Sequence, residues 1–538
     1  MFLRYHTPVA RGPNILVIMT DQHRGDALSC AWPAWRGGPS PVRTPSLDRL
    51  AAGGVRFDRA YVANPLCMPA RATILTGLPP RGHGVRTNGI DLDPRLPTLP
   101  AALARAGYAT HSAGKIHVRA YETPKGLDPA TLDPAGYPEA QWMWEHGKVT
   151  SLPSPYFGFQ SADFTGGHTS WMWGDYANWL NREHPGTLAL LDAQHGTRPA
   201  SGAEQSWRMA IPPALHYNTW IADRAIAFLE RTAGTGQPFL LSASFPDPHH
   251  GFAVPDPWYS LYDRATMPLP VRREGELDDL APFFRTIVDG NLGHPVSGRH
   301  GPTRMPDDHL REILAITCGM VSFVDEQVGR LLAALDRLGL AENTLVLFLA
   351  DHGDLMGDHW LMNKGPFHFD GLLRVPFIAR WPGRIPAGRT TSALASQLDV
   401  VPTLCEAVGI PLPEYGPPPG TAVEARNQLA SLPGRSLVPV LTGAAESVQD
   451  AVVVENDEDY LGLRLRTLVT PTHSLTVYVG EDGLKPFGEL FDLAADPGQL
   501  RNLWADSGSG PLRAALTERL MAELVRTDSR LPRRQGHA

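Results

Sequence analysis

Three short apolar runs, each followed directly by acidic or histidine residues, constrain the fold of this chain most strongly. They occupy residues 14–19, 239–245 and 344–350, and each has the length and composition of a buried strand. Helical periodicity lies between them, most clearly at 217–231 and 310–338. This alternation of strands and helices predicts an α/β fold with a large, mostly parallel central sheet flanked by helices.

The chain of 538 residues is longer than a single core usually supports, so we expect a second, smaller domain. A Pro/Gly-rich stretch at 411–433 separates the main part from a C-terminal part with three predicted strands and a helix. We therefore predict a main domain at 1–435 and a C-terminal α+β domain with a short antiparallel sheet at 436–538. An aromatic-rich segment at about 121–213 is predicted to be an insertion over the sheet edge, forming either a satellite core or a pocket wall.

Composition excludes several classes of protein. A net charge of −8 argues against nucleic acid as a partner, since a phosphate backbone favours a basic surface. No apolar run reaches the length of about 18 residues that spans a bilayer, so we expect no membrane segment. The first apolar run is too short for a signal-peptide core, and a cytoplasmic protein is expected. The four cysteines have neither a disulfide framework nor CxxC spacing.

The residues that follow the three predicted strands form a candidate site. Asp21 follows the first strand, His249 the second, and Asp351 and His352 the third. Ligands of open α/β sheets bind beyond the carboxyl ends of the strands, where these side chains would meet. Two carboxylates with an imidazole can hold one divalent cation. The alternative is helix capping and loop hydrogen bonding, which for Asp21 alone is equally plausible.

Cys67 is a further candidate for this site. Pro69 suits the first turn of a helix that runs through Leu75, so Cys67 is expected at a helix N-terminus. That end carries partial positive charge and free N–H groups, which favour an anionic substrate. The alternative is a buried, inert cysteine, the commoner fate of a single one.

Three further cationic or imidazole side chains belong to the candidate site. Lys115 and His117 alternate at period two after a short extended run, which predicts that they point to the same side of a strand. Lys364 follows the Asp351 loop closely. Individually such residues are more often solvated or structural, so the argument rests on their shared position at one sheet edge.

The sequence from Cys67 to Arg71, followed by Leu75-Thr76-Gly77, resembles the signature of the sulfatases, which belong to the alkaline phosphatase superfamily. The resemblance runs nearly end to end. Its further ordered matches are Asn14 to Gln22, Gly114-Lys115-Ile116-His117, Pro246-Asp247-Pro248-His249, Asp351-His352-Gly353-Asp354, Gly357-Asp358-His359, Asn363-Lys364-Gly365, Arg374-Val375-Pro376, Glu489 to Leu493, Asp496-Pro497 and Asn502-Leu503.

The resemblance implies an alkaline-phosphatase-like fold in which 1–435 is the catalytic domain. It also implies that a formylglycine-generating enzyme oxidises Cys67 to formylglycine, whose hydrated aldehyde supplies the nucleophilic hydroxyl. Asp21, Gln22, Asp351 and His352 would bind one divalent metal ion, with calcium expected. Many relatives carry Asp at the position of Gln22 and some carry Asn at that of His352, so manganese and magnesium stay open.

The remaining roles follow from the charge that a sulfate ester develops during hydrolysis. Lys115, Lys364 and Arg71 would neutralise the sulfuryl group. Protonated His249 would be the general acid for the departing alcohol, and His117 would take the proton that allows sulfate to leave.

The expected activity is hydrolysis of sulfate monoesters of an organic alcohol or phenol, with an aryl, alkyl or carbohydrate leaving group. Two alternatives stay open. A phosphonate monoester or phosphodiester hydrolase of the same superfamily would carry neutral residues in place of Lys115 and His117. A non-catalytic anion-binding relative would keep Cys67 as a thiol. The expected partner is a small organosulfate, and the resemblance allows a homo-oligomer.

Overall fold

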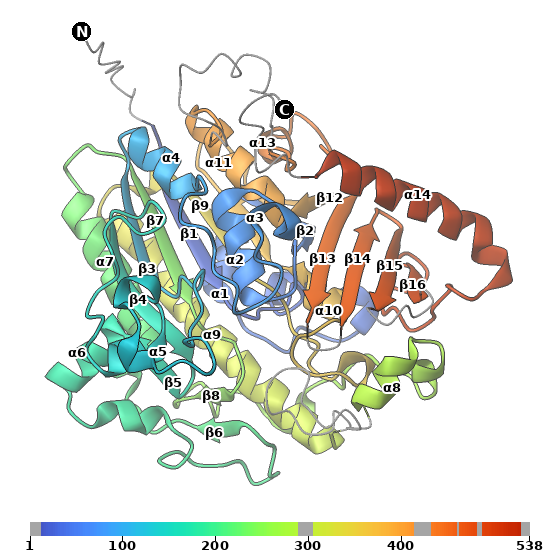
Figure 1. Cartoon of the computed structure of the whole chain (residues 1–538), viewed down its shortest axis with the longest axis horizontal. Helices are drawn as coiled ribbons and strands as arrows, with labels where there is room; N and C mark the ends of the chain where they lie inside the picture. The colour runs from blue at the N-terminus through green and yellow to red at the C-terminus, as the bar shows by residue number, and fades with distance from the viewer. Residues whose placement is uncertain (1–11, 289–304, 414–431, 460–461, 481–486, 529–538) are drawn as a thin grey trace.

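The computed structural model describes residues 12–288, 305–413, 432–459, 462–480 and 487–528. Most of the predicted linker at 411–433 lies outside these residues. Within them, ten strands form a mixed central sheet (Figure 1). The strands are β1 Asn14–Thr20, β2 Val55–Tyr61, β3 Ala109–Gly114, β4 Ser161–His168, β5 Trp171–Gly174, β7 Phe239–Phe245, β9 Thr344–Ala350, β10 Arg374–Val375, β11 Phe377–Arg380 and β12 Arg389–Ser396.

The three predicted strands are neighbours in the centre of this sheet. Its order is β10-β2-β11-β9-β1-β7-β3-β4-β5, with β12 paired to β2. β1 is parallel to both β7 and β9, and Leu16 aligns with Leu241 on one side and Val346 on the other. Because all three strands run in one direction, their carboxyl ends open at the same edge. The prediction of an α/β fold of the alkaline-phosphatase type is confirmed.

Helices cover both faces of the central sheet because β1 is apolar on both of its faces. Leu16 and Ile18 pack in a core with α1 Pro45–Ala52, α7 Tyr217–Thr232 and α9 Asp307–Arg337. Val17 and Met19 belong to the opposite core. The helices of that second face are α2 Cys67–Thr76, α4 Leu99–Arg105 and α11 Val400–Val408. None of the described helices combines the length and the apolar character needed to cross a membrane.

The segment predicted as an insertion extends the sheet as well as covering it. β4 pairs in parallel with β3, and β5 closes this edge in antiparallel fashion. The sequence of β4, SADFTGGH, has too few apolar residues to predict a strand. Around these strands Trp144, Tyr156 and Trp173 are buried in a core of their own. Further elements of the chain up to the linker are α3 Pro80–His83, α5 Gln141–Glu145, α6 Asp175–Glu183, β6 Ser206–Arg208, β8 Phe252–Val254, α8 Pro282–Val288 and α10 Asp370–Leu373.

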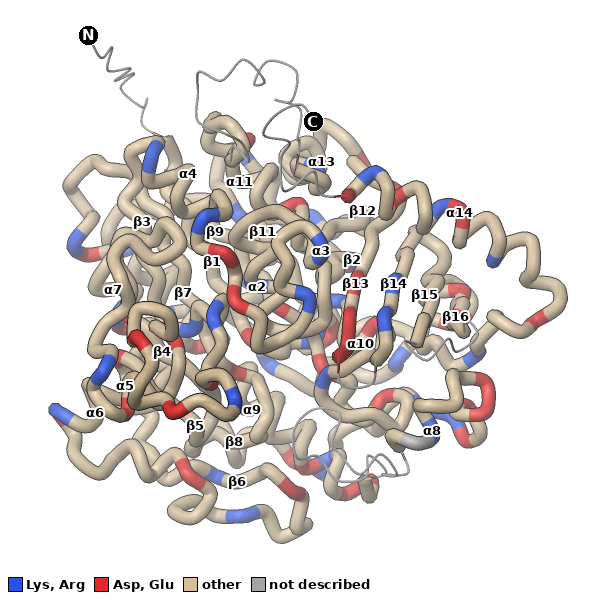
Figure 2. The backbone as a smooth tube through the Cα atoms, viewed as in Figure 1, with Lys and Arg blue, Asp and Glu red and all other residues tan. Residues whose placement is uncertain are grey.

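The C-terminal part contains a second sheet, which is four-stranded and antiparallel among the described residues. Its elements are β13 Val452–Glu458, β14 Leu463–Val469, β15 His473–Gly480, β16 Phe487–Asp492 and α14 Gly510–Arg526, preceded by α13 Val438–Thr442. Acidic β13 lies beside basic β14 (Figure 2), and Arg466 pairs with Asp457 at 2.6 Å. Val454 and Leu465 share the larger core with the central sheet, so a domain boundary at residue 435 stays a prediction.

Candidate functional site

Backbone hydrogen bonds between the central strands continue past the strand ends and hold Asp21 and Asp351 close together. The amide of Asp21 donates to the carbonyl of Phe245, at the end of β7, over 3.1 Å. The amide of Asp351 donates to the carbonyl of Thr20, at the end of β1, over the same distance. Both carboxylates are fully buried. The ladder therefore fixes the spacing of two buried anions at the sheet edge.

Arg71 holds these two carboxylates from helix α2. Its Nε donates to Asp351 Oδ2 over 2.8 Å, and one terminal nitrogen donates to Asp21 Oδ2 over 3.2 Å. The other terminal nitrogen reaches the carbonyl of Lys115 at 2.9 Å. Burial opposes the charge of Arg71, but Asp351 and Asp21 outweigh it and raise its pKa. Arg71 thus donates hydrogen bonds to the two acids and to the backbone of Lys115.

A compact group of potential metal ligands lies at this edge. The ligand atoms of Asp21, Cys67, Asp351 and His352 are all within 4.8 Å of one another. Gln22, the fourth expected ligand, lies beside them: its Nε2 donates to Asp354 Oδ2 over 2.5 Å and its Oε1 accepts from Lys364. Buried hard oxygens with one imidazole fit a divalent cation.

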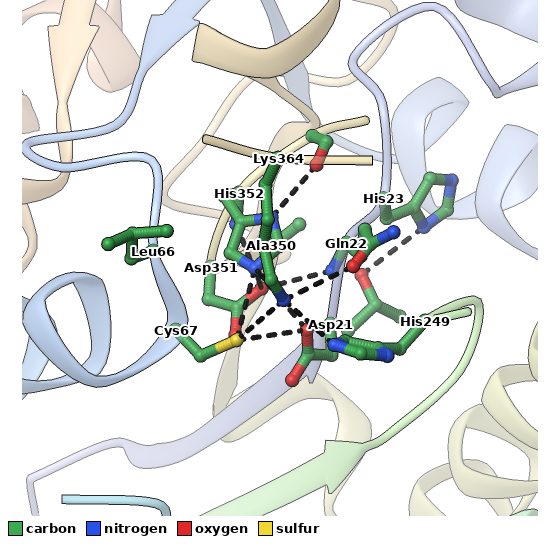
Figure 3. A network of polar contacts seen from close by, with 12 residues as sticks. Asp21, Gln22, His23, Leu66, Cys67, His249, Ala350, Asp351, His352 and Lys364 are labelled. Atoms are coloured by element: carbon green, nitrogen blue, oxygen red, sulfur yellow. Dashed lines mark hydrogen bonds and ion pairs between the residues drawn. The ribbon is translucent and has the colours of Figure 1, made fainter. Parts of the chain in front are cut away.

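Cys67 lies at the first residue of α2 and faces cations (Figure 3). Its Sγ is 3.0 Å from Lys364 Nζ and 3.2 Å from His352 Nε2. Burial and Asp21 act to raise the pKa of the thiol, but Lys364, Lys115 and His352 together lower it. The helix N-terminus adds to this positive potential. The position therefore favours an anionic nucleophile or an anionic substrate.

Lys364 also contacts His249, with Nζ 2.7 Å from Nε2. The loop that carries His249 is held from helix α7. Tyr217 donates to Asp247 Oδ1 over 2.5 Å, and Asn218 donates to Asp247 Oδ2 over 2.7 Å. Burial is the main cause that lowers the pKa of His249 well below its ordinary value, so the ring is neutral near pH 7.

Lys115 and His117 reach the site, but not from one side of a strand as predicted. β3 ends at Gly114, which has φ +102°, and a Cβ there would lie 2.0 Å from the carbonyl oxygen of Ser244. The chain therefore turns directly before Lys115, whose Nζ lies 2.5 Å from Asp21 Oδ2. His117 follows with a positive φ of 55°, and its ring stacks on Tyr121 with centroids 3.8 Å apart.

These side chains border a cavity of about 780 Å³. Cys67, Lys115, His117, His249 and Lys364 line its inner end. The outer wall combines aromatic and acidic residues from three parts of the chain, among them Asp91, Tyr121, Glu122, Tyr137, Trp171 and Glu458. Some aromatics of the 121–213 segment thus form a pocket wall while others form a satellite core, so both predicted roles occur.

Sequence reasoning missed His168, which also lines the cavity. It is the last residue of β4, and its ring lies 3.8 Å from that of His249 between centroids. The signal that found His249, a polar residue directly after an apolar strand, was absent here because β4 is itself polar and glycine-rich.

This alkaline-phosphatase-like fold, with a buried cysteine at a helix N-terminus amid acids and cations, is that of hydrolases that act on anionic esters. The chain belongs to the sulfatase family and is a sulfuric ester hydrolase. The family model described as Sulfatase matches residues 13–410, and the model described as N-sulphoglucosamine sulphohydrolase, C-terminal matches residues 357–526.

Individual relatives cover nearly the whole chain. An arylsulfatase of Clostridium perfringens is 27% identical over 91% of this chain and 90% of its own length. A choline-sulfatase of Rhizobium meliloti is 28% identical over 94% of this chain and 85% of its own length. Among solved structures, a phosphonate monoester hydrolase of Agrobacterium radiobacter is similar with a TM-score of 0.76 and 27% identity, covering 97% of both chains.

Proposed function

We propose that this sulfatase hydrolyses sulfate monoesters of an organic alcohol or phenol, using formylglycine at position 67 and one divalent metal ion. The observation that carries the proposal is the position of Cys67, at the start of α2 and within 3.0 Å of Lys364 Nζ and 3.2 Å of His352 Nε2. A formylglycine hydrate there would supply two hydroxyls on one carbon, one to take the sulfuryl group and the other to expel it.

Asp21, Gln22, Asp351 and His352 are the proposed metal ligands. The cluster of buried carboxylates and imidazole supports a hard or borderline divalent cation, and we propose calcium, with manganese and magnesium as alternatives. Such an ion would lower the pKa of a hydroxyl at residue 67 and orient a sulfate oxygen. Arg71 would act through these ligands, because its hydrogen bonds to Asp21 and Asp351 fix both carboxylates.

Lys115 and Lys364 are the proposed cations for the sulfuryl group. Both ammonium groups are buried at the inner end of the cavity, where little water screens their charge. Charge that accumulates on the transferred group is stabilised most by fixed cations in a water-poor site. His249 would donate a proton to the departing alcohol, with Lys364 as the group that holds this proton beside its ring.

His117 is the proposed base for the second step, in which sulfate leaves residue 67. Burial, with the charges of Lys115 and Arg71, holds the pKa of His117 well below its ordinary value. The ring is therefore neutral at physiological pH and free to accept a proton. Its stacking on Tyr121 fixes the plane of the imidazole at the cavity wall.

Hydrolysis of phosphonate monoesters is the second candidate, favoured by the TM-score of 0.76 to a phosphonate monoester hydrolase. The test is turnover of 4-nitrophenyl sulfate beside a 4-nitrophenyl phosphonate monoester, with protein co-expressed with a formylglycine-generating enzyme. We expect kcat/KM to favour the sulfate and Cys67→Ala to abolish activity. Preference for the phosphonate would overturn the assigned roles of Lys115 and His117.

We also infer that a formylglycine-generating enzyme matures the protein in the cytoplasm and that the partner is a small organosulfate. All four cysteines are free thiols, as expected in a reducing compartment. Mass spectrometry of the peptide containing residue 67 tests maturation, because conversion of Cys67 removes its sulfur. Retention of the thiol in fully co-expressed protein would favour the non-catalytic alternative. We also propose that the protein forms a homo-oligomer, which light scattering would test.

A further inference from the structure

A buried carboxylate lies behind His117, and no cation of the described residues pairs with it. Glu139 is fully buried and comes from the 121–213 segment. Its Oε1 accepts from Tyr156 Oη over 2.7 Å and from the amide of Val118 over 3.3 Å. The neighbouring Arg119 instead pairs with Asp91 at 2.7 Å. A buried, unpaired carboxylate lowers stability by several kcal/mol, roughly, so its presence requires an explanation.

The atoms around this carboxylate share an unusual feature. Glu139 Oε2, Tyr121 Oη and His117 Nδ1 are all buried without a hydrogen-bond partner among the described residues. Buried polar atoms are rarely left unpartnered in proteins, and a group of them indicates a functional site or ordered water. The ring of Tyr121 stacks on that of His117 and both line the cavity, while Glu139 lies behind this wall and accepts from the amide of Val118.

Glu139 can change its charge near neutral pH. The pKa of Glu139 is raised to about 7, mainly by burial and to a smaller extent by Asp91. Hydrogen bonds from Tyr156 and from the backbone at His117 and Val118 act in the opposite direction. The other ionisable groups that face this region are Tyr121 and Arg119. Those that face His117 itself are Lys115, Arg71, Asp21 and Lys364.

We propose that Glu139 is a positioning residue for His117 during release of sulfate, a role that rests on the proposed function. Its carboxylate holds the His117–Val118 backbone, and its negative charge stabilises the proton that His117 takes up. In that step His117 takes the proton of the remaining hydroxyl at residue 67, the O–H electron pair becomes the second carbonyl bond, and sulfate leaves with the electron pair of the C–O bond.

The sign of the pH effect follows from this arrangement. An ionised Glu139 stabilises the imidazolium that forms, whereas a protonated Glu139 does not. The rate of sulfate release therefore rises with pH through the pKa of Glu139, at about 7. Formation of 4-nitrophenolate in the first step does not involve this proton transfer, so the rise belongs to the steady-state rate and not to the initial burst.

Glu139→Gln tests the proposal, because Gln keeps an acceptor for Tyr156 and Val118 but removes the charge. Glu489→Gln is a matched control: Glu489 is also fully buried, accepts from Tyr478 Oη over 2.8 Å and has an unpartnered second oxygen, but it lies in the C-terminal sheet. Pre-steady-state turnover of 4-nitrophenyl sulfate is measured across pH with both variants. We expect Glu139→Gln to lose the rise near pH 7 and about ten- to a hundredfold of steady-state turnover, as for other orienting carboxylates.

A second variant keeps the carboxylate. Tyr156→Phe removes a hydrogen bond that favours the ionised form of Glu139, so the rise should move to higher pH, whereas Tyr478→Phe should leave it in place. The proposal is overturned if Glu139→Gln has the pH profile of Glu489→Gln, or if its loss lies in the burst. A wild-type enzyme that does not turn over 4-nitrophenyl sulfate would instead contradict the proposed function.

Discussion

Lys364 Nζ lies 2.7 Å from His249 Nε2, while Nδ1 of the same ring lies 2.5 Å from the carbonyl oxygen of His250. A carbonyl only accepts hydrogen bonds, so Nδ1 carries the hydrogen and Nε2 is the acceptor that faces the lysine. Under the proposed function, the proton for a leaving group would therefore reside on Lys364 and reach the substrate through His249 or directly. We therefore expect the two side chains to act as one proton-donating unit.

This unit predicts how activity depends on the leaving group. An alkoxide leaves far less readily than 4-nitrophenolate, so loss of the proton donor harms alkyl sulfates more. We expect His249→Ala to lower kcat/KM for an alkyl sulfate by about 10²- to 10⁴-fold and for 4-nitrophenyl sulfate much less. A series of aryl sulfates of increasing leaving-group pKa measures this. The kcat/KM of His249→Ala should fall more steeply with leaving-group pKa than that of the wild type.

Lys364→Met should lower kcat/KM for every leaving group, because its ammonium also faces the sulfuryl group. Adding His249→Ala to Lys364→Met should cost less than His249→Ala costs alone, since the two side chains share the proton-donating role. Equal losses in His249→Ala on all leaving groups would show that His249 binds the sulfuryl group rather than serving the alcohol.

Cys67→Ser separates the two steps of the reaction. A serine hydroxyl can accept the sulfuryl group but has no second hydroxyl on its carbon to expel it. We expect at most one equivalent of 4-nitrophenolate per enzyme, followed by arrest, and a sulfate ester on the peptide that contains residue 67 by mass spectrometry. Continued turnover would mean that water attacks the ester directly, and that the second hydroxyl is not needed.

Arg71 is predicted to matter for stability and metal binding together. Arg71→Met leaves Asp21 and Asp351 buried without their shared guanidinium, which lowers the free energy of unfolding by about 3–5 kcal/mol in comparable cases. Urea unfolding measures this, and Arg95→Met is the control, since that arginine pairs with Asp93 at the surface and its loss should change nothing measurable.

After treatment with a chelator, Arg71→Met should bind calcium more weakly than the wild type in titration calorimetry, because the carboxylates of Asp21 and Asp351 are no longer fixed. Unchanged stability and calcium affinity would assign Arg71 to the substrate instead. Chelation of the wild type should abolish turnover, and adding back calcium, manganese or magnesium separately identifies the ion that restores it.

Glu489, which lies outside the active site, should make the stability of the protein depend on pH. Burial raises its pKa from an ordinary 4.5 to about 8 in the folded protein. The folded state then binds more protons than the unfolded state between these values, so this group lowers stability as pH rises through that window. Glu489→Gln should remove the effect. The variant should therefore gain Tm relative to wild type as pH rises from about 5 to 8, and a constant difference would contradict the shift.

The centre of the fold and part of the site were predictable from local patterns. A strand-length apolar run followed by a polar residue indicates a buried strand. It also indicates the end of that strand at which functional side chains lie. Asp21, Asp351 and His352 were found in this way, and Cys67 from the helix start that Pro69 indicates. β7 and β9 have the predicted bounds without change.

Lys115 and His117 show where local pattern fails. Their alternation predicted a strand, but the strand ends at Gly114, where the close approach of Ser244 leaves no space for a side chain. That contact joins segments far apart in the chain, so no local window contains it. β4 and its terminal His168 were missed because a polar, glycine-rich strand becomes one only by pairing with β3.

The sequence by itself determined the family and the central strands, because these depend on residue order and apolar period, and it supplied Cys67 as the proposed nucleophile. Only the tertiary structure decided which charges meet. It placed Arg71 on the carboxylates, Lys364 against His249, and Glu139 behind the loop of His117. The physical reason is that burial and charge pairing depend on distance in space, and the residues concerned lie on elements that only folding brings together.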